Sequence, residues 1–147
     1  MAPSAKQRGK QLRKAQKRRR ARNAQRQNGP LPTTGVRMSD VIRHLAEPIV
    51  AELCNSVDDL ERIITLTIAA WNLTLFSSDA QSQQFQKLSR RYFGHDCASV
   101  AKFRWICDVV AKRKMQFYPH LNIAILDVHF TRESANTVYF EVAYAIA

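Results

Sequence analysis

Charge and bulky apolar side chains are divided unequally along this chain. Residues 1–37 contain 12 Lys and Arg and no acidic residue, whereas residues 38–147 contain 11 basic and 12 acidic residues. All 13 aromatic residues lie after position 38. The first segment therefore has too little apolar surface to offset roughly 1–2 kcal/mol of backbone entropy per ordered residue. This division predicts a basic arm, residues 1–37, followed by one globular domain, residues 38–147.

The basic arm ends in a linker, NGPLPTTG, which places two Pro and two Gly within residues 28–35. Residues 10–27 contain neither Gly nor Pro and are rich in Lys, Arg, Gln and Ala, which favour helix. Like charges four residues apart, such as Lys10 and Lys14, oppose it. We expect the arm to be disordered or conditionally helical, and to become helical when phosphates neutralise the repulsion.

A segment this basic predicts a polyanionic partner, and counterion release from phosphates would supply the affinity. Arg-rich segments often become ordered on RNA. The arm has no aromatic residue that could stack on a base, so we expect contacts mainly to RNA or ribosomal RNA phosphates. The cations expected to make these contacts are Lys10, Arg13, Lys14, Lys17, Arg18, Arg19, Arg20 and Arg22.

Two other roles for the arm stay open from the sequence. The arm could serve targeting or solubility, with the domain acting as an interaction module for another protein. A membrane surface is disfavoured because the arm has no Trp, no Phe and no aliphatic face.

Membrane-spanning and secretory classes are not expected, because the chain has no run of 18 apolar residues and no apolar signal segment near its start. The three cysteines, Cys54, Cys97 and Cys107, are odd in number and widely spaced. This pattern predicts a reducing compartment, the cytoplasm or, in a eukaryote, also the nucleus.

Apolar side chains at helical spacing predict about four helices in the domain. The expected ranges are about 39–54, 57–76, 79–92 and 99–118, with Ser39, Ser56 and Ser78 as caps and Gly94 as a stop signal. Pro48 should kink the first helix or split it in two. The second helix has the broadest apolar stripe and should form the centre of the core around Trp71. In the third helix, Phe85, Leu88 and Tyr92 are the expected buried side.

The C-terminal residues change to the alternating pattern of strands. Residues 122–130 and 138–146 predict an antiparallel hairpin, with TRESAN as the connection and Leu126, Val128 and Phe130 on one side. The fold class is therefore α+β. A lone hairpin has open edges, so we expect one edge to be covered, either by a helix or by a second copy in a homodimer.

The stretches SVDDLERIITLTIAAWNLTLF and KRKMQFYPHLNIAILDVHF resemble segments of small uncharacterised bacterial domains. The resemblance covers residues 39–145 and leaves the arm out. It implies a helical domain with a C-terminal hairpin, and it implies no activity and no site residues.

His95, Cys97 and Cys107 are the residues that most resemble a metal site or a nucleophile pair. Structural zinc needs four ligands, usually in paired short spacings, and a cysteine nucleophile needs a base and an oxyanion site. Neither pattern is complete, so we expect a loop followed by a buried Cys107. No catalytic site, metal or cofactor is expected.

Two further features have structural explanations. Asn72, in the middle of a helix, is expected to be a surface residue or to make structural hydrogen bonds. Lys112, Arg113 and Lys114 complement the helix dipole at the end of the fourth helix, and could also extend the phosphate-binding surface of the arm.

Overall fold

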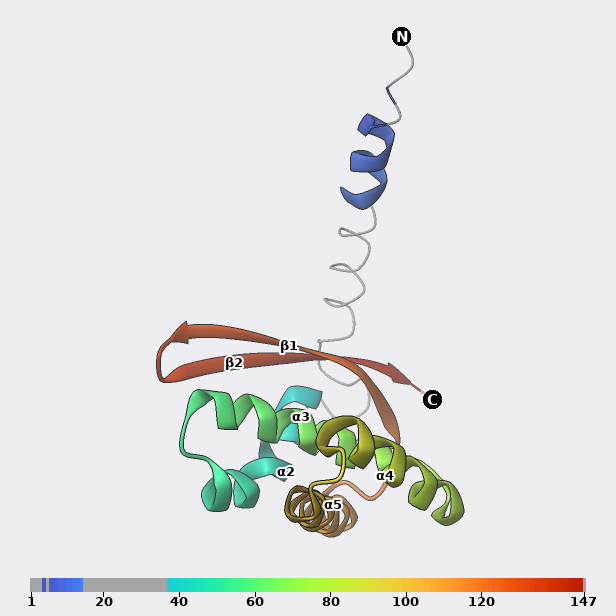
Figure 1. The fold of residues 1–147 in the computed structure, drawn as a ribbon, viewed down its shortest axis with the longest axis vertical. Helices are drawn as coiled ribbons and strands as arrows, with labels where there is room; N and C mark the ends of the chain where they lie inside the picture. Colours follow the sequence, from blue (N-terminus) through green and yellow to red (C-terminus); the bar gives the residue numbers. More distant parts are fainter. Residues whose placement is uncertain (1–3, 5, 15–36, 147) are drawn as a thin grey trace.

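The computed structural model describes residues 4, 6–14 and 37–146 (Figure 1). In these residues it has five helices and one two-stranded antiparallel sheet, which confirms the α+β class. The first helix covers residues 6–14. The later elements are α2 (Met38–Leu53), α3 (Val57–Leu73), α4 (Ser78–Phe93), α5 (Cys97–Phe117), β1 (Ile123–Ser134) and β2 (Thr137–Ile146).

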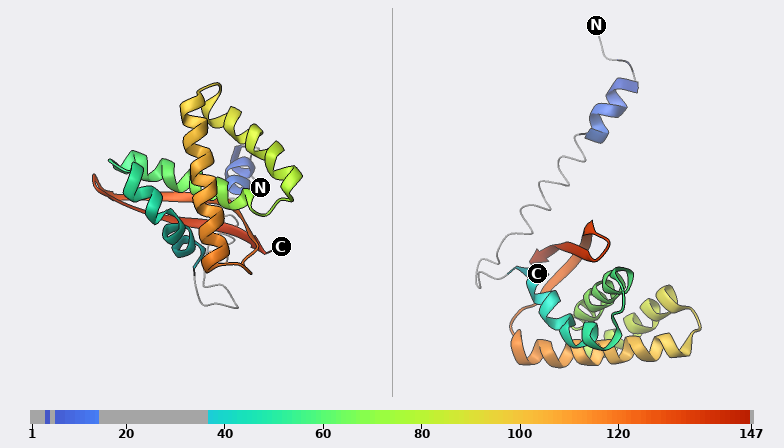
Figure 2. Two further views of the ribbon diagram at one scale, coloured as in Figure 1. Left: turned by 90° about the horizontal axis from the view of Figure 1, so that it is seen from below. Right: turned by 90° about the vertical axis from the view of Figure 1, so that its left-hand side faces the viewer.

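The domain is layered, with the hairpin over one side of α2 and α3 and with α5 on the opposite side (Figures 1 and 2). One apolar core extends from Met38 in α2 to Tyr144 in β2. Trp71 of α3 is fully enclosed in it, as the apolar stripe predicts. Its indole Nε1 donates a hydrogen bond to the Ile123 carbonyl at 2.7 Å.

Helix α2 is continuous through Pro48, so of the two predicted outcomes, a kink or a split, the split does not occur. Proline has no N–H, and the carbonyl of His44, four residues earlier, loses its usual helical partner. The guanidinium of Arg113 in α5 donates a hydrogen bond to this carbonyl at 2.8 Å. A neighbouring helix therefore supplies the bond that the proline removes. The predicted cap Ser39 is also wrong, because α2 begins at Met38, which is buried in the core.

The other helix ends follow local hydrogen bonds. Ser56 caps α3 as predicted, its hydroxyl accepting from the Asp59 N–H at 3.1 Å. Helix α5 begins at Cys97, before the expected Ser99, because the Asp96 carboxylate accepts from the Ala98 N–H at 3.2 Å.

Helix α3 ends at Leu73, short of the expected residue 76, and the Thr74 hydroxyl donates to the Trp71 carbonyl at 2.6 Å. Helix α4 begins at Ser78 itself, so Ser78 is not its cap. Gly94 ends α4 with a φ of 59°, a conformation that favours glycine.

Helix α4 packs on the core through Phe85 and Leu88, as predicted, and through Phe93 in place of Tyr92. Phe85 stacks on Phe103 of α5 with ring centroids 5.3 Å apart, and Phe93 packs on the same ring at 5.8 Å. Because Phe93 takes the inner position at the end of the helix, Tyr92 is turned outward and is 43% exposed. The prediction that Tyr92 is buried is therefore wrong.

The hairpin is longer than predicted, and its connection is only residues 135–136. A register irregularity lies between Ile125 and Asp127, so Leu126 has no partner in β2 and is 62% exposed. Such a bulge shifts the alternation by one residue. The inner side of β1 is consequently formed by Ile123, Ile125, Val128 and Phe130, and the expected inward position of Leu126 is wrong.

Helix α3 bonds the backbone of β1 near the start of the strand. The Asn72 side chain donates from Nδ2 to the Ile125 carbonyl and accepts at Oδ1 from the Ile125 N–H, both at 2.9 Å. These bonds give Asn72 a structural role, and they satisfy the backbone of β1 at Ile125. Pairing of β2 with a second copy stays a prediction.

Candidate polyanion-binding surface

The structure describes one continuous stretch of the arm, the helix of residues 6–14. This helix begins with a capping box. The Ser4 hydroxyl accepts from the Gln7 N–H at 3.4 Å, and Gln7 Oε1 accepts from the Ser4 N–H at 3.1 Å. This reciprocal pair satisfies two backbone donors that a helix start leaves open. The spacing of Ser4 and Gln7 in the sequence could have predicted this helix start.

The described arm helix carries five cations and no acidic residue, and all of its residues are exposed. Four of the cations, Lys6, Lys10, Arg13 and Lys14, follow the spacing i, i+4, i+7, i+8, which places them along one face. Arg8 lies on the other side. Lys6 and Arg8 were not among the predicted contacts, although they belong to the same charged helix.

The structure places three of the eight predicted contact residues, Lys10, Arg13 and Lys14, on this helix. The other five, Lys17, Arg18, Arg19, Arg20 and Arg22, lie outside the described residues.

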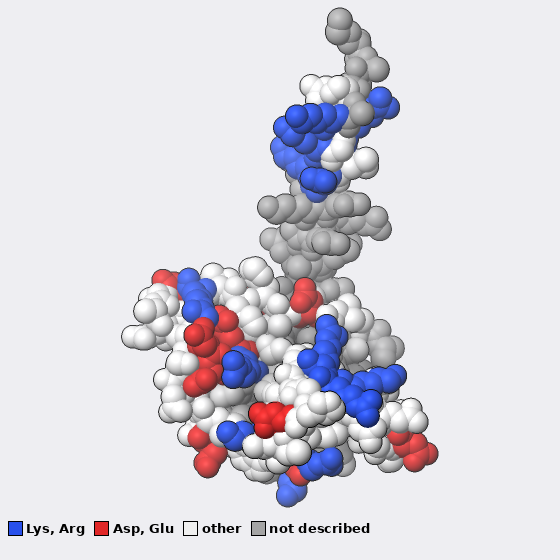
Figure 3. Space-filling view, in the orientation of Figure 1, with Lys and Arg blue, Asp and Glu red and all other residues white. Residues whose placement is uncertain are grey.

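The domain is nearly neutral, but its charges are separated in space. Residues 78–117 carry eight basic and three acidic residues, whereas residues 38–77 carry two basic and six acidic. Figure 3 shows the result: basic side chains gather over α4, and acidic side chains gather over the start of α3. The part of the domain that could contact a polyanion is therefore the side formed by α4 and the adjoining end of α5.

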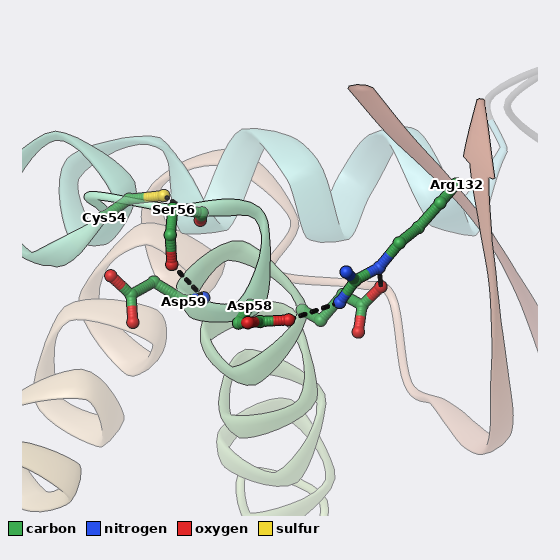
Figure 4. A network of polar contacts seen from close by, with 6 residues as sticks. Cys54, Ser56, Asp58, Asp59 and Arg132 are labelled. Carbon is green, nitrogen blue, oxygen red and sulfur yellow. Dashed lines mark hydrogen bonds and ion pairs between the residues drawn. The ribbon is translucent and has the colours of Figure 1, made fainter. Parts of the chain in front are cut away.

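The acidic end of the domain is held in a network of polar contacts (Figure 4). Arg132 of β1 donates to the carboxylates of Asp58 and Glu61, and the Nε–Oε1 distance to Glu61 is 2.9 Å. The pKa of Arg132 is raised by its hydrogen bonds to Glu61 and Asp58. This network joins the far end of the hairpin to α3 and pairs Arg132 with two carboxylates.

The basic residues near the end of α5, residues 112–114, also contact other groups of the fold at two of their three positions. Arg113 bonds the His44 carbonyl and lies 3.7 Å from the Glu47 carboxylate. Lys114 is 6% exposed, its Nζ lies 4.9 Å from the centre of the Trp71 ring, and burial lowers its pKa. The alternative that this run extends the phosphate-binding surface therefore fails for Arg113 and Lys114, because neither can turn to solvent without losing its contacts.

His95, Cys97 and Cys107 do not come together. Cys97 is exposed at the start of α5, with its Sγ 3.8 Å from the His95 carbonyl oxygen. Cys107 is ten residues further along α5, about 15 Å at 1.5 Å per residue, and packs against the core. Burial raises the pKa of the Cys107 thiol to about 12, so it is protonated and a poor nucleophile. Among the described residues, no group of three or more His, Cys, Asp or Glu could hold a metal ion.

The fold and the charged surfaces together define a small α+β domain that follows a cationic helix. Comparison with protein-family models, with curated proteins and with solved structures gave no match. None of the helices in the described residues is both long enough and apolar enough to cross a membrane.

Proposed function

We propose that this protein is a non-catalytic RNA-binding protein whose basic arm contacts RNA or ribosomal RNA phosphates. The observation that carries the proposal is the arm helix 6–14, with five exposed cations and no acidic residue. Phosphates are spaced densely enough to neutralise such a helix, and the released counterions provide the driving force. Since phosphates carry no base identity, this contact is independent of sequence.

The test neutralises the charged face without changing helix propensity. In the full chain, Lys6, Lys10, Arg13 and Lys14 are replaced by Gln, and affinity for a 12-nucleotide single strand is measured at 50 mM salt. We expect affinity to fall by about 100-fold or more, equally for different sequences, because four phosphate contacts are removed.

The matched control exchanges Lys for Arg and Arg for Lys at the same four positions. It keeps every charge and should keep the affinity. Equal affinities for the wild-type and the Gln variant would rule out the arm helix as the RNA contact. The other predicted contacts, Lys17, Arg18, Arg19, Arg20 and Arg22, would then have to carry the binding, and their replacement by Gln would test them in turn.

A second copy of the chain is proposed as the partner of the outer edge of β2. Residues 138–146 contain one charged residue, Glu141, and edge strands that avoid pairing usually carry more charge. Sedimentation should show a monomer–dimer equilibrium that shifts with concentration. A monomer at every concentration would exclude the homodimer.

The proposed location is a reducing compartment, the cytoplasm or a eukaryotic nucleus. The three cysteines are free thiols in the structure, which fits such a compartment.

A further inference from the structure

Three hollows run along the side of the domain between α3, α4 and the start of α5. The largest, about 500 Å³, lies between α3, α4 and the bulge of β1. The second, about 460 Å³, shares Thr65 and Tyr92 with it. The third, about 200 Å³, shares Arg62 and Phe93 with the second and reaches Lys102. Because neighbouring hollows share lining residues, we treat them as one groove, the α4 groove.

Exposed aromatic side chains line the α4 groove. Tyr92 borders the first two hollows and is 43% exposed, and Phe76 lines the first hollow and is 44% exposed. An exposed aromatic ring in a hollow is the group on which single-stranded bases stack, whatever their identity. The arm has no such residue, so base contact would have to come from the domain.

The cations around the α4 groove have no ion-pair partner in the described part of the chain. This holds for Arg62 and Arg91, which line the groove, and for Lys87 and Arg90, which are exposed on α4. Elsewhere in the domain, by contrast, Arg43, Arg113 and Arg132 each pair with a carboxylate.

The acidic groups of the α4 groove lie at its two ends and bond the backbone. Asp127 lines the first hollow and accepts from the Val128 N–H at 2.9 Å. Asp59 lines the third hollow and accepts from the Asn55 N–H at 3.0 Å. The middle of the groove, around Tyr92 and Arg62, has no carboxylate in its lining. The surface is therefore complementary to a polyanion with exposed flat rings.

We infer that the α4 groove binds single-stranded RNA, with a base stacked on Tyr92 and backbone phosphates beside Arg91 and Arg62. This inference rests on the RNA binding proposed above and adds a second contact to it. A base in a duplex hides both faces in the stack, whereas an unpaired base presents a face to an aromatic ring. The arm then supplies affinity through charge, and the groove supplies preference for unpaired bases.

The test separates the contribution of the bases to the affinity from that of the phosphates. The full chain is titrated with a 12-nucleotide oligouridine strand and with an abasic strand that has the same number of phosphates. Since stacking contributes about 1–3 kcal/mol per base, the oligouridine should bind roughly 5- to 150-fold more tightly. Tyr92→Leu should reduce this ratio toward one and leave the affinity for the abasic strand unchanged.

Two control variants keep the comparison matched. Tyr92→Phe retains an aromatic ring and should keep the ratio. Trp105→Leu removes another exposed aromatic residue, which does not line the groove, and should also keep the ratio. Photocrosslinking of the wild-type chain to a 4-thiouridine strand should label the peptide that contains Tyr92, and it does not depend on any variant folding.

The outcomes distinguish the two proposals. Equal affinity for both strands, or crosslinks confined to the arm and β2, would overturn the groove and leave the arm proposal standing. No binding of either strand at 50 mM salt would overturn both.

Discussion

The last turns of α4 and α5 have similar basic sequences, but the cations of the two helices make different contacts. Each helix carries three cations near its C-terminal end, where they complement the helix dipole. In α5, Arg113 and Lys114 are bound within the fold. In α4, Lys87, Arg90 and Arg91 are exposed and form no ion pair with another described residue. The charges in the sequence therefore do not show which cations can bind a ligand. The contacts that each side chain makes in the fold show it.

The difference traces to what each helix packs against. Helix α5 lies against α2 and α3. There Arg113 bonds the His44 carbonyl, which has no helical partner because of Pro48, and Lys114 lies over the ring of Trp71. Helix α4 touches the core through Phe85 and Phe93 and leaves its polar side to solvent. The same contrast between enclosed and exposed side chains can be tested with three matched pairs of residues.

The two tryptophans should give the largest effect. Trp71 is fully enclosed and bonds the Ile123 carbonyl, whereas Trp105 is 39% exposed. Trp71→Ala should lower the free energy of unfolding by about 3–5 kcal/mol. Trp105→Ala should cost much less. Chemical denaturation measures both, and similar losses would contradict the enclosed position of Trp71.

Arg113 and Lys112 form the second pair. Arg113→Ala should cost about 1–3 kcal/mol, because the His44 carbonyl would be left without a partner. Lys112→Ala should change stability by about 0.5 kcal/mol or less. In a chain that already carries Pro48→Ala, the N–H of residue 48 can bond this carbonyl. The loss from Arg113→Ala should then shrink, and a double-mutant cycle measures the coupling. Additive losses would show that Arg113 does not replace the missing bond.

Features that repeat along one segment could be predicted from the sequence. The apolar stripe of α3, the Ser56 cap, the Gly94 stop and the antiparallel hairpin each follow from residues close together in the chain. The capping box of Ser4 and Gln7 is equally local, and the spacing of these two residues predicts it.

Features that depend on distant residues could not be predicted. The partner of the His44 carbonyl at Pro48 is Arg113 of another helix, and the ring on which Phe93 packs, in place of Tyr92, is Phe103 of α5. The bulge at Leu126 shifts the alternation of β1 without any Gly or Pro to mark it. The α4 groove likewise exists only once α3, α4 and β1 are assembled.

Cys107 and Cys97 form the third pair, and the difference between them is confined to alkaline pH. Burial raises the pKa of Cys107 from 9.0 to about 12. Between these pH values the unfolded chain loses the proton that the folded chain keeps, so stability should fall as pH rises from 9 toward 12. Cys107→Ala should make this fall less steep, and Cys97→Ala should leave it unchanged. Unfolding at a series of pH values measures the difference, and parallel curves for Cys107→Ala and the wild-type would refute the buried thiol.

The central claim is that the arm holds RNA through phosphates, and the salt dependence of binding tests it most directly. If about five arm cations contact phosphates at once, the log–log slope should be about −3.5, and affinity should fall roughly 100-fold between 50 and 200 mM salt. Gln at Lys10, Arg13, Lys14, Lys17, Arg18, Arg19, Arg20 and Arg22 should remove most of that slope, and a variant with Lys at the five Arg positions should keep it. An unchanged slope in the Gln variant, or no binding by the wild-type chain at 50 mM salt, would contradict the claim.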